Sequence, residues 1–509
     1  MQRRWYREIL RRRIFIILLL LLQIIFLAYV LRGDNHVINV LSTIIRVIGI
    51  FLALKVIYEP GNGSLKTGWI LLLLIFPVAG TLLYLLVHFQ SSTRRFQQAL
   101  NEITRINAPS YKLQKTAISN AAAEYPEYST VFHYLQDKMK YPVYGESDTH
   151  YLSPGEEFLP VFLEDLKSAQ RYIFLEYFII QEGEMWNSIL EVLEQKAAEG
   201  VDVRVMYDDV GCFVKLPKNY RKILDSKGIK CMVFNPFRPI LSAIQNNRDH
   251  RKITAIDGRI AYTGGMNLAD EYINVYEVHG HWKDCALRVE GKAAWSLTLI
   301  FLELWQLCSN VKEDVKAYYP DFTFPFSCPG YVQPYADSPM DDENVGEQVY
   351  LQMIYSARRT LFITTPYLIL DDRMVSALSL AAKSGVDVRI ITPHIADHAL
   401  VSVVTRSYYR TLIDNGVKLY EYTKGFIHSK NFIVDGRAAA VGTINLDFRS
   451  LYLHFECGAF LCGTPSVQDV EKDFLDTLSV CHQILPKDCR ASLPMRLFQE
   501  LLRLFAPLM

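Results

Sequence analysis

Two copies of one short motif hold the residues whose types and spacing suit chemistry. Histidine, lysine, aspartate and asparagine follow one another at identical spacing in each copy: His250, Lys252, Asp257 and Asn267 first, then His428, Lys430, Asp435 and Asn445. Transfer at a phosphodiester needs a nucleophile, a fixed cation and a hydrogen-bond donor for the phosphate oxygens. The motif supplies these groups twice, so it predicts phosphodiester chemistry rather than packing.

His250 and His428 are the candidate nucleophile and the candidate proton donor. Imidazole titrates near neutral pH, so one ring can attack phosphorus while the other protonates the departing oxygen. The first step would form a phosphohistidine, which divides one difficult displacement into two easier ones. In the second step the protonating histidine, now neutral, takes the proton of the incoming hydroxyl. Either histidine can take either role.

The lysines and asparagines of the motif are the candidate phosphate-binding groups. Lys252 and Lys430 each follow their histidine by two residues, so in a strand the two side chains share a face. Each cation can then bind non-bridging phosphate oxygens, and the amides of Asn267 and Asn445 can donate to the same oxygens. Small residues before each asparagine allow close backbone approach or add a small donor: Gly264, Gly265, Gly442 and Thr443.

Two pairs of acidic residues are candidates for supporting roles. Asp257 and Asp435 complete the motif and count as catalytic candidates, but a glycine follows each, which favours a turn. Asp284 and Glu456 open corresponding strands late in each repeat, so they are the better candidates for orienting a histidine. No cofactor or metal is expected, because no His/Asp/Glu cluster beyond the motifs has ligand spacing and the lysines already supply positive charge.

The motif lies inside a longer duplication that predicts an α/β fold. Each copy contains a helical pattern, a buried-strand run, a second helix ending at glycine, and one identical pentapeptide, residues 200–204 and 385–389. Strands that alternate with helices indicate α/β units, and two such units can pair about a pseudo-twofold axis. We therefore expect two homologous domains, residues 151–325 and 326–509, after a helical and turn-rich connecting segment over 91–150.

Residues 1–90 have the composition of a membrane anchor. Uncharged runs over 14–31 and 68–87 are each close to the roughly 20 residues that span a ~30 Å hydrocarbon core. The apolar stretch 37–58 carries Arg46 and Lys55, which leaves the number of spans at two or three. The first run lacks an evident cleavage site, so an uncleaved anchor is expected.

The orientation of the anchor is open from the sequence. Six arginines before residue 14 place the N-terminus in the cytoplasm. Arginines at 94, 95 and 105 favour a cytoplasmic site, which needs an even number of spans, whereas three spans would place it outside. We expect a multi-pass protein of a bacterial cell membrane with a cytoplasmic catalytic part. The apolar positions of 493–509 predict a docked core helix, with a helix in the membrane interface as the alternative.

Charge and cysteine content exclude several classes of protein. The 54 basic and 54 acidic residues give no broad electrostatic footprint for nucleic acid. Nine cysteines without a C-x-x-C pair are expected to be reduced, and to form neither a disulfide framework nor a zinc site.

The duplicated pattern H-x-K-x4-D-x6-G-[GST]-x-N resembles the signature of the phospholipase D superfamily. The N-terminal apolar runs and the stretches 250–252, 264–267 and 445–456 are similar to those of bacterial cardiolipin synthases. The resemblance covers nearly the whole chain and implies, in each half, a sandwich of mixed sheets flanked by helices. It implies transfer of a phosphatidyl group between two phosphatidylglycerol molecules through a phosphohistidine, giving cardiolipin and glycerol. One departure is Lys283 before Asp284, where the resemblance leads us to expect arginine.

Other activities fit the same residues less well. A hydrolytic phospholipase D, with water as acceptor, and a phosphatidylserine synthase are the close alternatives. A nuclease fits poorly with a neutral, membrane-anchored chain. A catalytically silent protein that only binds phospholipid headgroups is a different class, and the two intact motifs argue against it. Apart from what the resemblance implies, the sequence does not determine the second substrate, the preferred acyl chains or the oligomeric state.

Overall fold

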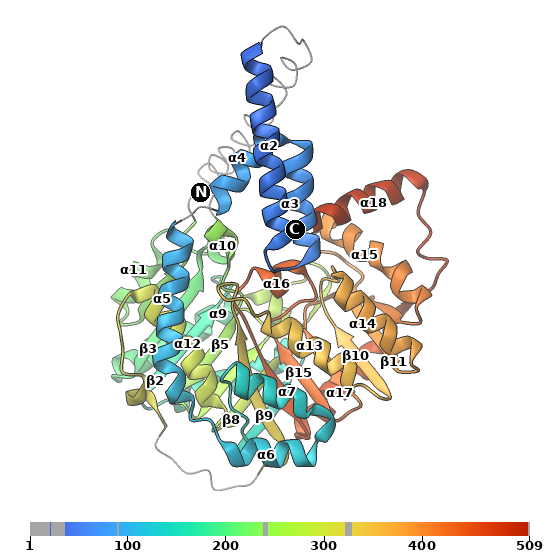
Figure 1. Ribbon diagram of the computed structural model, residues 1–509. Coiled ribbons are helices and arrows are strands. Elements are labelled where there is room, and N and C mark those ends of the chain that lie inside the picture. The colour runs from blue at the N-terminus through green and yellow to red at the C-terminus, as the bar shows by residue number, and fades with distance from the viewer. Residues whose placement is uncertain (1–20, 22–35, 89–90, 238–242, 321–327, 507–509) are drawn as a thin grey trace. The chain divides into compact units, whose positions relative to one another are not determined.

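The computed structural model describes residue 21 and residues 36–88, 91–237, 243–320 and 328–506 (Figure 1). The chain divides into two compact units. One unit comprises Met1–Phe96, Phe237–Asn247 and Glu500–Met509, and the other comprises Gln97–Pro236 and Arg248–Gln499. Both copies of the motif belong to the second unit.

The described residues of the first unit include three apolar helices: α2 (His36–Tyr58), α3 (Gly63–Ile75) and α4 (Pro77–His88). Among the described residues, one helical stretch, Val40–Tyr58, is long and apolar enough to cross a membrane. The stretch is 19 residues long with a mean hydropathy of 2.3. It belongs to the segment that the sequence left as an optional span. The expected span over 14–31 lies outside the described residues, apart from residue 21.

The expected single helix over 68–87 is instead a helical hairpin. Helix α3 ends at Ile75, and Pro77 begins α4 after the capping residue Phe76, because proline cannot continue the hydrogen-bonded helix. A side chain on Gly80 would collide with a backbone oxygen of α3, and the rings of Trp69 and Tyr84 lie 5.4 Å apart, so the two helices fold back on each other. At 13 and 12 residues, each helix is about 20 Å long and too short for a ~30 Å hydrocarbon core.

Short helices precede the duplicated part of the chain, as the composition of residues 91–150 predicts. The segment also contains one π-helical turn. The elements are α5 (Ser91–Asn107), η1 (Ala108–Tyr111), α6 (Lys115–Glu124), η2 (Pro126–Tyr128), α7 (Ser129–His133) and η3 (Tyr134–Lys138).

The first half of the second unit is built on a seven-stranded mixed sheet of order β1-β8-β6-β5-β2-β3-β4. Central strand β2 is buried throughout, which explains its continuous apolar sequence. The strands are β1 (Ser147–Leu152), β2 (Tyr172–Tyr177), β3 (Asp202–Asp208), β4 (Lys230–Phe234), β5 (Lys252–Ile256), β6 (Ile260–Gly264) and β8 (Ala286–Gly291). The predicted domain boundary at residue 151 falls within β1.

The second half repeats this sheet with one added edge strand, in the order β17-β12-β11-β10-β14-β15-β16-β9. Strand by strand, β9, β16, β15, β14, β10, β11 and β12 stand where β1, β8, β6, β5, β2, β3 and β4 stand in the first half. The strands are β9 (Tyr331–Asp337), β10 (Thr360–Thr364), β11 (Asp387–Pro393), β12 (Lys418–Tyr422), β14 (Asn431–Val434), β15 (Ala438–Gly442), β16 (Glu456–Cys462) and β17 (Cys481–Ile484). The predicted duplication is therefore a duplication of topology.

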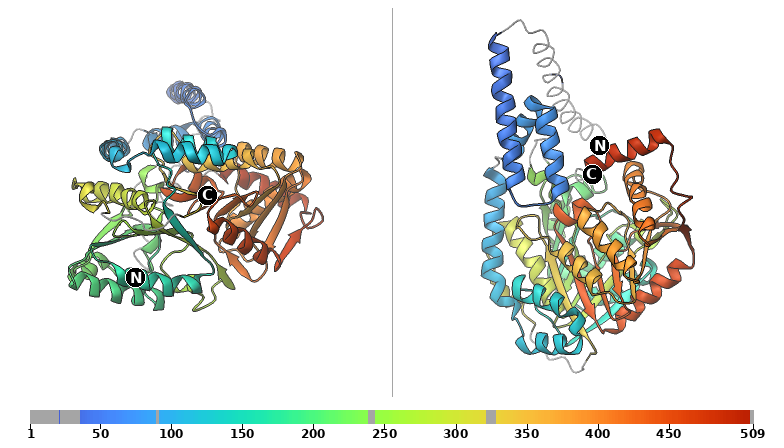
Figure 2. Two further views of the ribbon diagram at one scale, coloured as in Figure 1. Left: turned by 90° about the horizontal axis from the view of Figure 1, so that it is seen from below. Right: turned by 45° about the vertical axis from the view of Figure 1, so that its right-hand side comes forward.

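Helices flank both sheets, and the left view of Figure 2 shows the first half, in green, beside the second, in orange. The predicted glycine stops are present, since Gly200 and Gly385 adopt positive φ after α9 and α14. The first half contains α8 (Gly155–Ser168), α9 (Glu184–Ala198), α10 (Asp209–Cys212), α11 (Tyr220–Ser226), η5 (Asp270–Ile273), α12 (Ala294–Ser309) and η6 (Val315–Tyr318), whereas η4 (Ala243–Asn246) belongs to the first unit. The second half contains α13 (Val345–Ser356), α14 (Asp372–Lys383), α15 (Ala399–Asp414), α16 (Phe448–Tyr452) and α17 (Pro465–Leu478).

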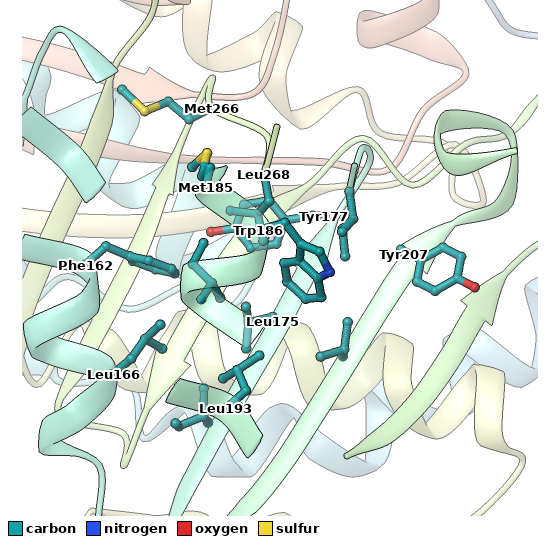
Figure 3. Close-up of a cluster of buried hydrophobic side chains, with 14 of the residues drawn as sticks. Phe162, Leu166, Leu175, Tyr177, Met185, Trp186, Leu193, Tyr207, Met266 and Leu268 are labelled. Atoms are coloured by element: carbon teal, nitrogen blue, oxygen red, sulfur yellow. The ribbon is translucent and has the colours of Figure 1, made fainter. Parts of the chain in front are cut away.

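The core of the first half lies between its sheet and helices α8 and α9. Figure 3 shows Trp186 of α9 among Leu175, Tyr177 and Leu193, all of them buried. Aromatic side chains contribute most of the buried apolar area in such a cluster. This packing fixes the end of β2 beside the strand that follows His250.

The two halves share a hydrophobic core and a small sheet. Strands β7 (His281–Lys283) and β13 (Gly425–Ile427), one from each half, pair in parallel. Side chains of β8, including Leu287 and Val289, belong to the same buried cluster as Ile433 and Val441 of the second half. The halves are therefore packed directly against each other, as the pseudo-twofold expectation requires.

Two smaller predictions have opposite outcomes. All nine cysteines are free, five of them buried, which confirms that they form no disulfide framework. Helix α18 (Leu493–Phe505) has no buried residue, and Leu497 and Leu501 are exposed, so the expected docked core helix is wrong. The interfacial alternative for this amphipathic helix stays a prediction.

Candidate active site

Corresponding loops of the two halves position the two motif histidines. His250 precedes β5, and His428 lies between β13 and β14. The backbone N–H of His250 donates to the carbonyl of Phe455 at 2.9 Å, and that of His428 donates to the carbonyl of Lys283 at 2.7 Å. Each histidine is thus held by the main chain of the opposite half, and both are buried.

The side chains of the histidines are also held across the interface. His250 Nδ1 lies 2.9 Å from both carboxylate oxygens of Glu456 in the second half. His428 Nδ1 lies 2.6 Å from Asp284 Oδ2 in the first half. A carboxylate can only accept, so Nδ1 carries the hydrogen and Nε2 is left with a lone pair. Asp284 and Glu456 thus lie where histidine-orienting residues must be, but each orients the histidine of the other repeat.

The motif's small residues hold these two carboxylates in different ways. A side chain on Gly265 would collide with Asp284 Oδ1, so only glycine leaves room for that carboxylate. The same Oδ1 accepts from the backbone N–H of Cys285 at 2.8 Å. In the second half the hydroxyl of Thr443 donates to Glu456 Oε2. At equivalent positions of the repeat, Gly265 therefore pairs with the shorter acid, Asp284, and Thr443 with the longer one, Glu456.

Lys252 and Lys430 lie beside their histidines, as their spacing predicts. Lys252 Nζ donates to the carbonyl of His250 at 2.7 Å. Lys430 Nζ donates to the carbonyl of His428 and lies 2.9 Å from the Nδ1 atom of its ring. Burial lowers the pKa of Lys252 to about 8 and that of Lys430 to about 7, although nearby carboxylates oppose the shift.

Burial also keeps both imidazoles neutral. It is the largest cause that lowers the pKa of His428 to about 4, and the charge of Lys430 adds to it. Burial lowers the pKa of His250 well below its usual value, with contributions from Lys252, Lys430 and His428. Since charges of the second motif act on the histidine of the first, the two motif copies form one electrostatic site.

The two motif asparagines have different surroundings. Asn267 Oδ1 accepts from the backbone N–H of Ile179 at 3.0 Å, and its Nδ2 donates to the hydroxyl of Tyr272 at 2.6 Å. One of its two amide hydrogens is therefore used within the protein. Asn445 Oδ1 is buried without a hydrogen-bond partner in the described structure.

Asp257 and Asp435 lie at the far ends of their strands. The carboxylate of Asp257 accepts from three backbone N–H groups, at residues 170–172, at 2.7 to 2.8 Å. That of Asp435 accepts from residues 358–360 at 2.6 to 2.9 Å. Both residues have positive φ, and β5 or β14 separates each from its histidine. The structure therefore places both carboxylates in turns, away from the imidazoles.

Comparison with known proteins gives the family. A family model described as "Cardiolipin synthase, PLD-like domain" matches residues 162–282 and 350–478. The cardiolipin synthase of Alkalihalophilus pseudofirmus is 35% identical over 461 residues, which cover 90% of this chain and 91% of that protein. This chain belongs to the cardiolipin synthase family. An uncharacterized protein of Streptococcus mutans is 40% identical over 442 residues, 87% of this chain and 96% of that one.

A solved structure supports the fold of this cardiolipin synthase family member. The crystal structure of phosphatidylserine synthase from Haemophilus influenzae superposes with a TM-score of 0.54 and 17% sequence identity. The match covers 71% of this chain and 93% of that one. The fold is thus the expected pair of phospholipase D-like α/β domains, and the family is one of phosphatidyltransferase enzymes.

Two further residues of this family member's candidate site are not among those that the sequence predicted. Trp282 and His454 each lie two residues before an orienting carboxylate, at equivalent positions of the repeat. The ring of Trp282 lies 5.5 Å from that of His428, and the ring of His454 lies 5.6 Å from that of His250. Their shared offset from Asp284 and Glu456 is the signal in the sequence that would have found them.

Folding also creates a group of metal-ligating atoms that linear spacing does not show. Donor atoms of His250, His454 and Glu456 lie within 4.8 Å of one another, in the part of the chain that the structure describes. Two imidazoles and a carboxylate are ligand types that suit zinc. The buried ammonium groups of Lys252 and Lys430 act on the same site and disfavour a cation there.

Proposed function

We propose that this protein transfers a phosphatidyl group from one phosphatidylglycerol to another, giving cardiolipin and glycerol. The observation that carries the proposal is the crossed arrangement of two imidazoles, each held through Nδ1 by a buried carboxylate of the opposite repeat. Membership of the cardiolipin synthase family supports this substrate over other phosphodiesters.

In the first step, the Nε2 atom of one neutral imidazole attacks the phosphorus of the donor lipid. A nitrogen–phosphorus bond forms, the bond from phosphorus to the headgroup glycerol oxygen breaks, and the other imidazole gives its proton to that oxygen. Lys252 and Lys430 bind the non-bridging oxygens. The phosphate's negative charge favours the protonated form of the second imidazole, which burial otherwise disfavours.

In the second step, a hydroxyl of the second phosphatidylglycerol attacks the phosphohistidine. An oxygen–phosphorus bond forms, the nitrogen–phosphorus bond breaks, and the hydroxyl proton passes to the second imidazole. Asp284 and Glu456 hold the two rings in the tautomer and orientation that both steps require. These steps need no cofactor.

The anchor fits a substrate that resides in a bilayer. Helix α2 contains the span candidate Val40–Tyr58. We propose a multi-pass protein of the bacterial cell membrane with a cytoplasmic site, in which residues 1–90 hold the second unit near its lipids. A lipid substrate also explains the absence of a basic surplus in the sequence, because a single phosphate needs only local charge.

The test is to incubate purified protein with phosphatidylglycerol in detergent, without nucleotide or added metal, and to identify the products by mass spectrometry. Cardiolipin and glycerol in equal amounts are the expected products. Phosphatidic acid and glycerol would instead establish a hydrolytic phospholipase D. Product formation only after addition of serine and a nucleotide-activated lipid would favour a phosphatidylserine synthase. No conversion of any lipid would favour a silent phospholipid-binding protein.

A further inference from the structure

The two halves of the site differ in the side chain that precedes each orienting carboxylate. Trp282 and Tyr272 of the first half, with Phe426 of the second, form an aromatic wall around His428, at ring distances of 5.5, 5.6 and 5.9 Å. In the second half the equivalent residue is His454, a titratable ring beside His250. The wall around His428 is therefore aromatic, whereas the polar wall beside His250 includes His454 as well as the ring of Phe178, at 5.1 Å.

The polar wall contains several buried atoms without hydrogen-bond partners. In the part of the chain that the structure describes, Asn445 Oδ1, Arg449 Nε, Ser450 Oγ and both ring nitrogens of His454 are buried and unpaired. His454 Nδ1 lies 3.6 Å from Glu456 Oε1, which is beyond a hydrogen bond. Native proteins seldom leave such groups unsatisfied, because each buried unpaired group is destabilising. Five such atoms within one ten-residue segment form a group that can bind a polar ligand.

The charges of this segment favour an anion. No carboxylate lies within 4 Å of the Arg449 guanidinium among the described residues, and burial is the main cause that lowers its pKa. Asp447 acts on the charge of Arg449 and Glu456 on that of His454, but both acids are already engaged. Glu456 bonds His250 and Thr443, and Asp447 caps α16 by accepting from the backbone N–H of Ser450. Arg449 is half-buried, and a guanidinium with no carboxylate in contact is a strong binding group for a phosphate.

We propose that Arg449 and His454 form a second phosphate-binding subsite, which holds the phosphodiester of the acceptor lipid beside His250. The inference rests on the proposed function, in which the donor phosphate occupies Lys252 and Lys430. The acceptor carries its own phosphate one glycerol unit from the attacking hydroxyl. The ring of His454 lies 5.6 Å from that of His250. A phosphate bound to His454 is therefore displaced from the reacting phosphorus, as the phosphate of the acceptor must be.

This subsite explains why transfer to a lipid would prevail over hydrolysis. Water and free glycerol carry no negative charge, so Arg449 cannot hold either of them beside the phosphohistidine. Phosphatidylglycerol carries a phosphate, which Arg449 binds. The binding free energy of the acceptor phosphate thus orients the hydroxyl for attack. The hydroxyl proton of the acceptor passes to the second imidazole and the nitrogen–phosphorus bond breaks. These bond changes are the same for any alcohol acceptor.

The test compares an anionic and an uncharged acceptor on the same phosphohistidine. Cardiolipin formation uses phosphatidylglycerol as acceptor, whereas incorporation of labelled glycerol into phosphatidylglycerol uses an alcohol without charge. Both reactions are measured on the full chain in mixed micelles, for wild type, Arg449→Gln, Arg449→Lys and His454→Asn. Arg410→Gln is the matched control, because Arg410 is an exposed helix residue paired with Asp414.

We expect Arg449→Gln to lower cardiolipin formation at least about tenfold, the usual effect of losing a charge-assisted hydrogen bond, and to change glycerol exchange less than about twofold. Arg449→Lys should recover part of the loss, His454→Asn should show the same selective loss, and Arg410→Gln should match wild type. Retained exchange also shows that each variant is folded.

Three results would overturn the subsite. An equal fall of both reactions in folded Arg449→Gln and His454→Asn would assign these residues to the donor phosphate. Unchanged cardiolipin formation in both variants would show that no phosphate binds there. If the wild-type protein catalyses neither reaction, the proposed function itself fails, and the subsite fails with it.

Discussion

The carboxylate of Glu456 in the second repeat holds the imidazole of His250 in the first, with both oxygens 2.9 Å from Nδ1. The reciprocal contact joins Asp284 and His428 at 2.6 Å. Neither repeat can therefore orient its own histidine, so one half alone should be inactive. The duplication has produced one site and not two.

Both motif histidines are expected to be essential. His250→Ala and His428→Ala should each lower cardiolipin formation by about a thousandfold or more, because one change removes the nucleophile and the other the proton donor. Both variants should remain in the membrane fraction. Product analysis by mass spectrometry and fractionation of membranes provide the measurements, and near-normal turnover in either variant would contradict the two-histidine mechanism.

The crossed carboxylates are expected to act on rate more than on folding. Asp284→Asn and Glu456→Gln keep the side-chain volume but can present an N–H to Nδ1, which favours the wrong tautomer of the ring. We expect kcat to fall by about 10²- to 10⁴-fold in each variant, as for the buried aspartate of a catalytic triad. A thermal melt close to that of wild type is the control. Full activity of both variants would show that the contacts are not used.

Asp257 and Asp435 should show the opposite behaviour. Each carboxylate accepts three backbone hydrogen bonds far from the imidazoles. Asp257→Asn and Asp435→Asn should lower the free energy of unfolding by about 1 to 3 kcal/mol, while the activity of each folded molecule is kept. Denaturant titration beside a specific-activity assay tests this, and a large loss of kcat without loss of stability would restore their catalytic assignment.

Activity towards the anionic lipid should fall as the pH rises through neutrality. The pKa of Lys430 is about 7 and that of Lys252 about 8, both lowered by burial, so each ammonium is charged below its pKa and loses its charge above it. The value of kcat/KM should therefore fall more steeply between about pH 7 and about pH 8, where loss of the lysine charges adds to loss of the protonated imidazole. The measurement is a profile from about pH 5 to about pH 9 at constant ionic strength.

A matched variant tests the cause of that decline. In Lys430→Arg the guanidinium stays charged throughout this range, so the steeper decline should begin only with Lys252, at about pH 8, even though the absolute rate is lower. A profile that is flat for the wild-type protein, or identical in the variant, would show that the lysines do not set the pH dependence.

The sequence alone determined the repeated architecture of this protein and predicted its chemistry. Three residue types at matched spacing restrict the reaction because their chemistry is local: an imidazole, an ammonium and an amide keep their reactivity wherever the chain places them. Likewise, the repeated order of apolar strands, helices and glycine stops at Gly200 and Gly385 follows from local periodicity and backbone preference.

Only the tertiary structure decided which residues share the site. Glu456 meets His250, and Trp282 and His454 meet different histidines, because packing of one repeat against the other brings together residues far apart in sequence. The same holds for the hairpin at Phe76 and Pro77, where apolar composition alone is equally compatible with one long helix. Composition and spacing act along the chain, whereas these contacts depend on which buried surfaces fit each other, which a linear pattern does not contain.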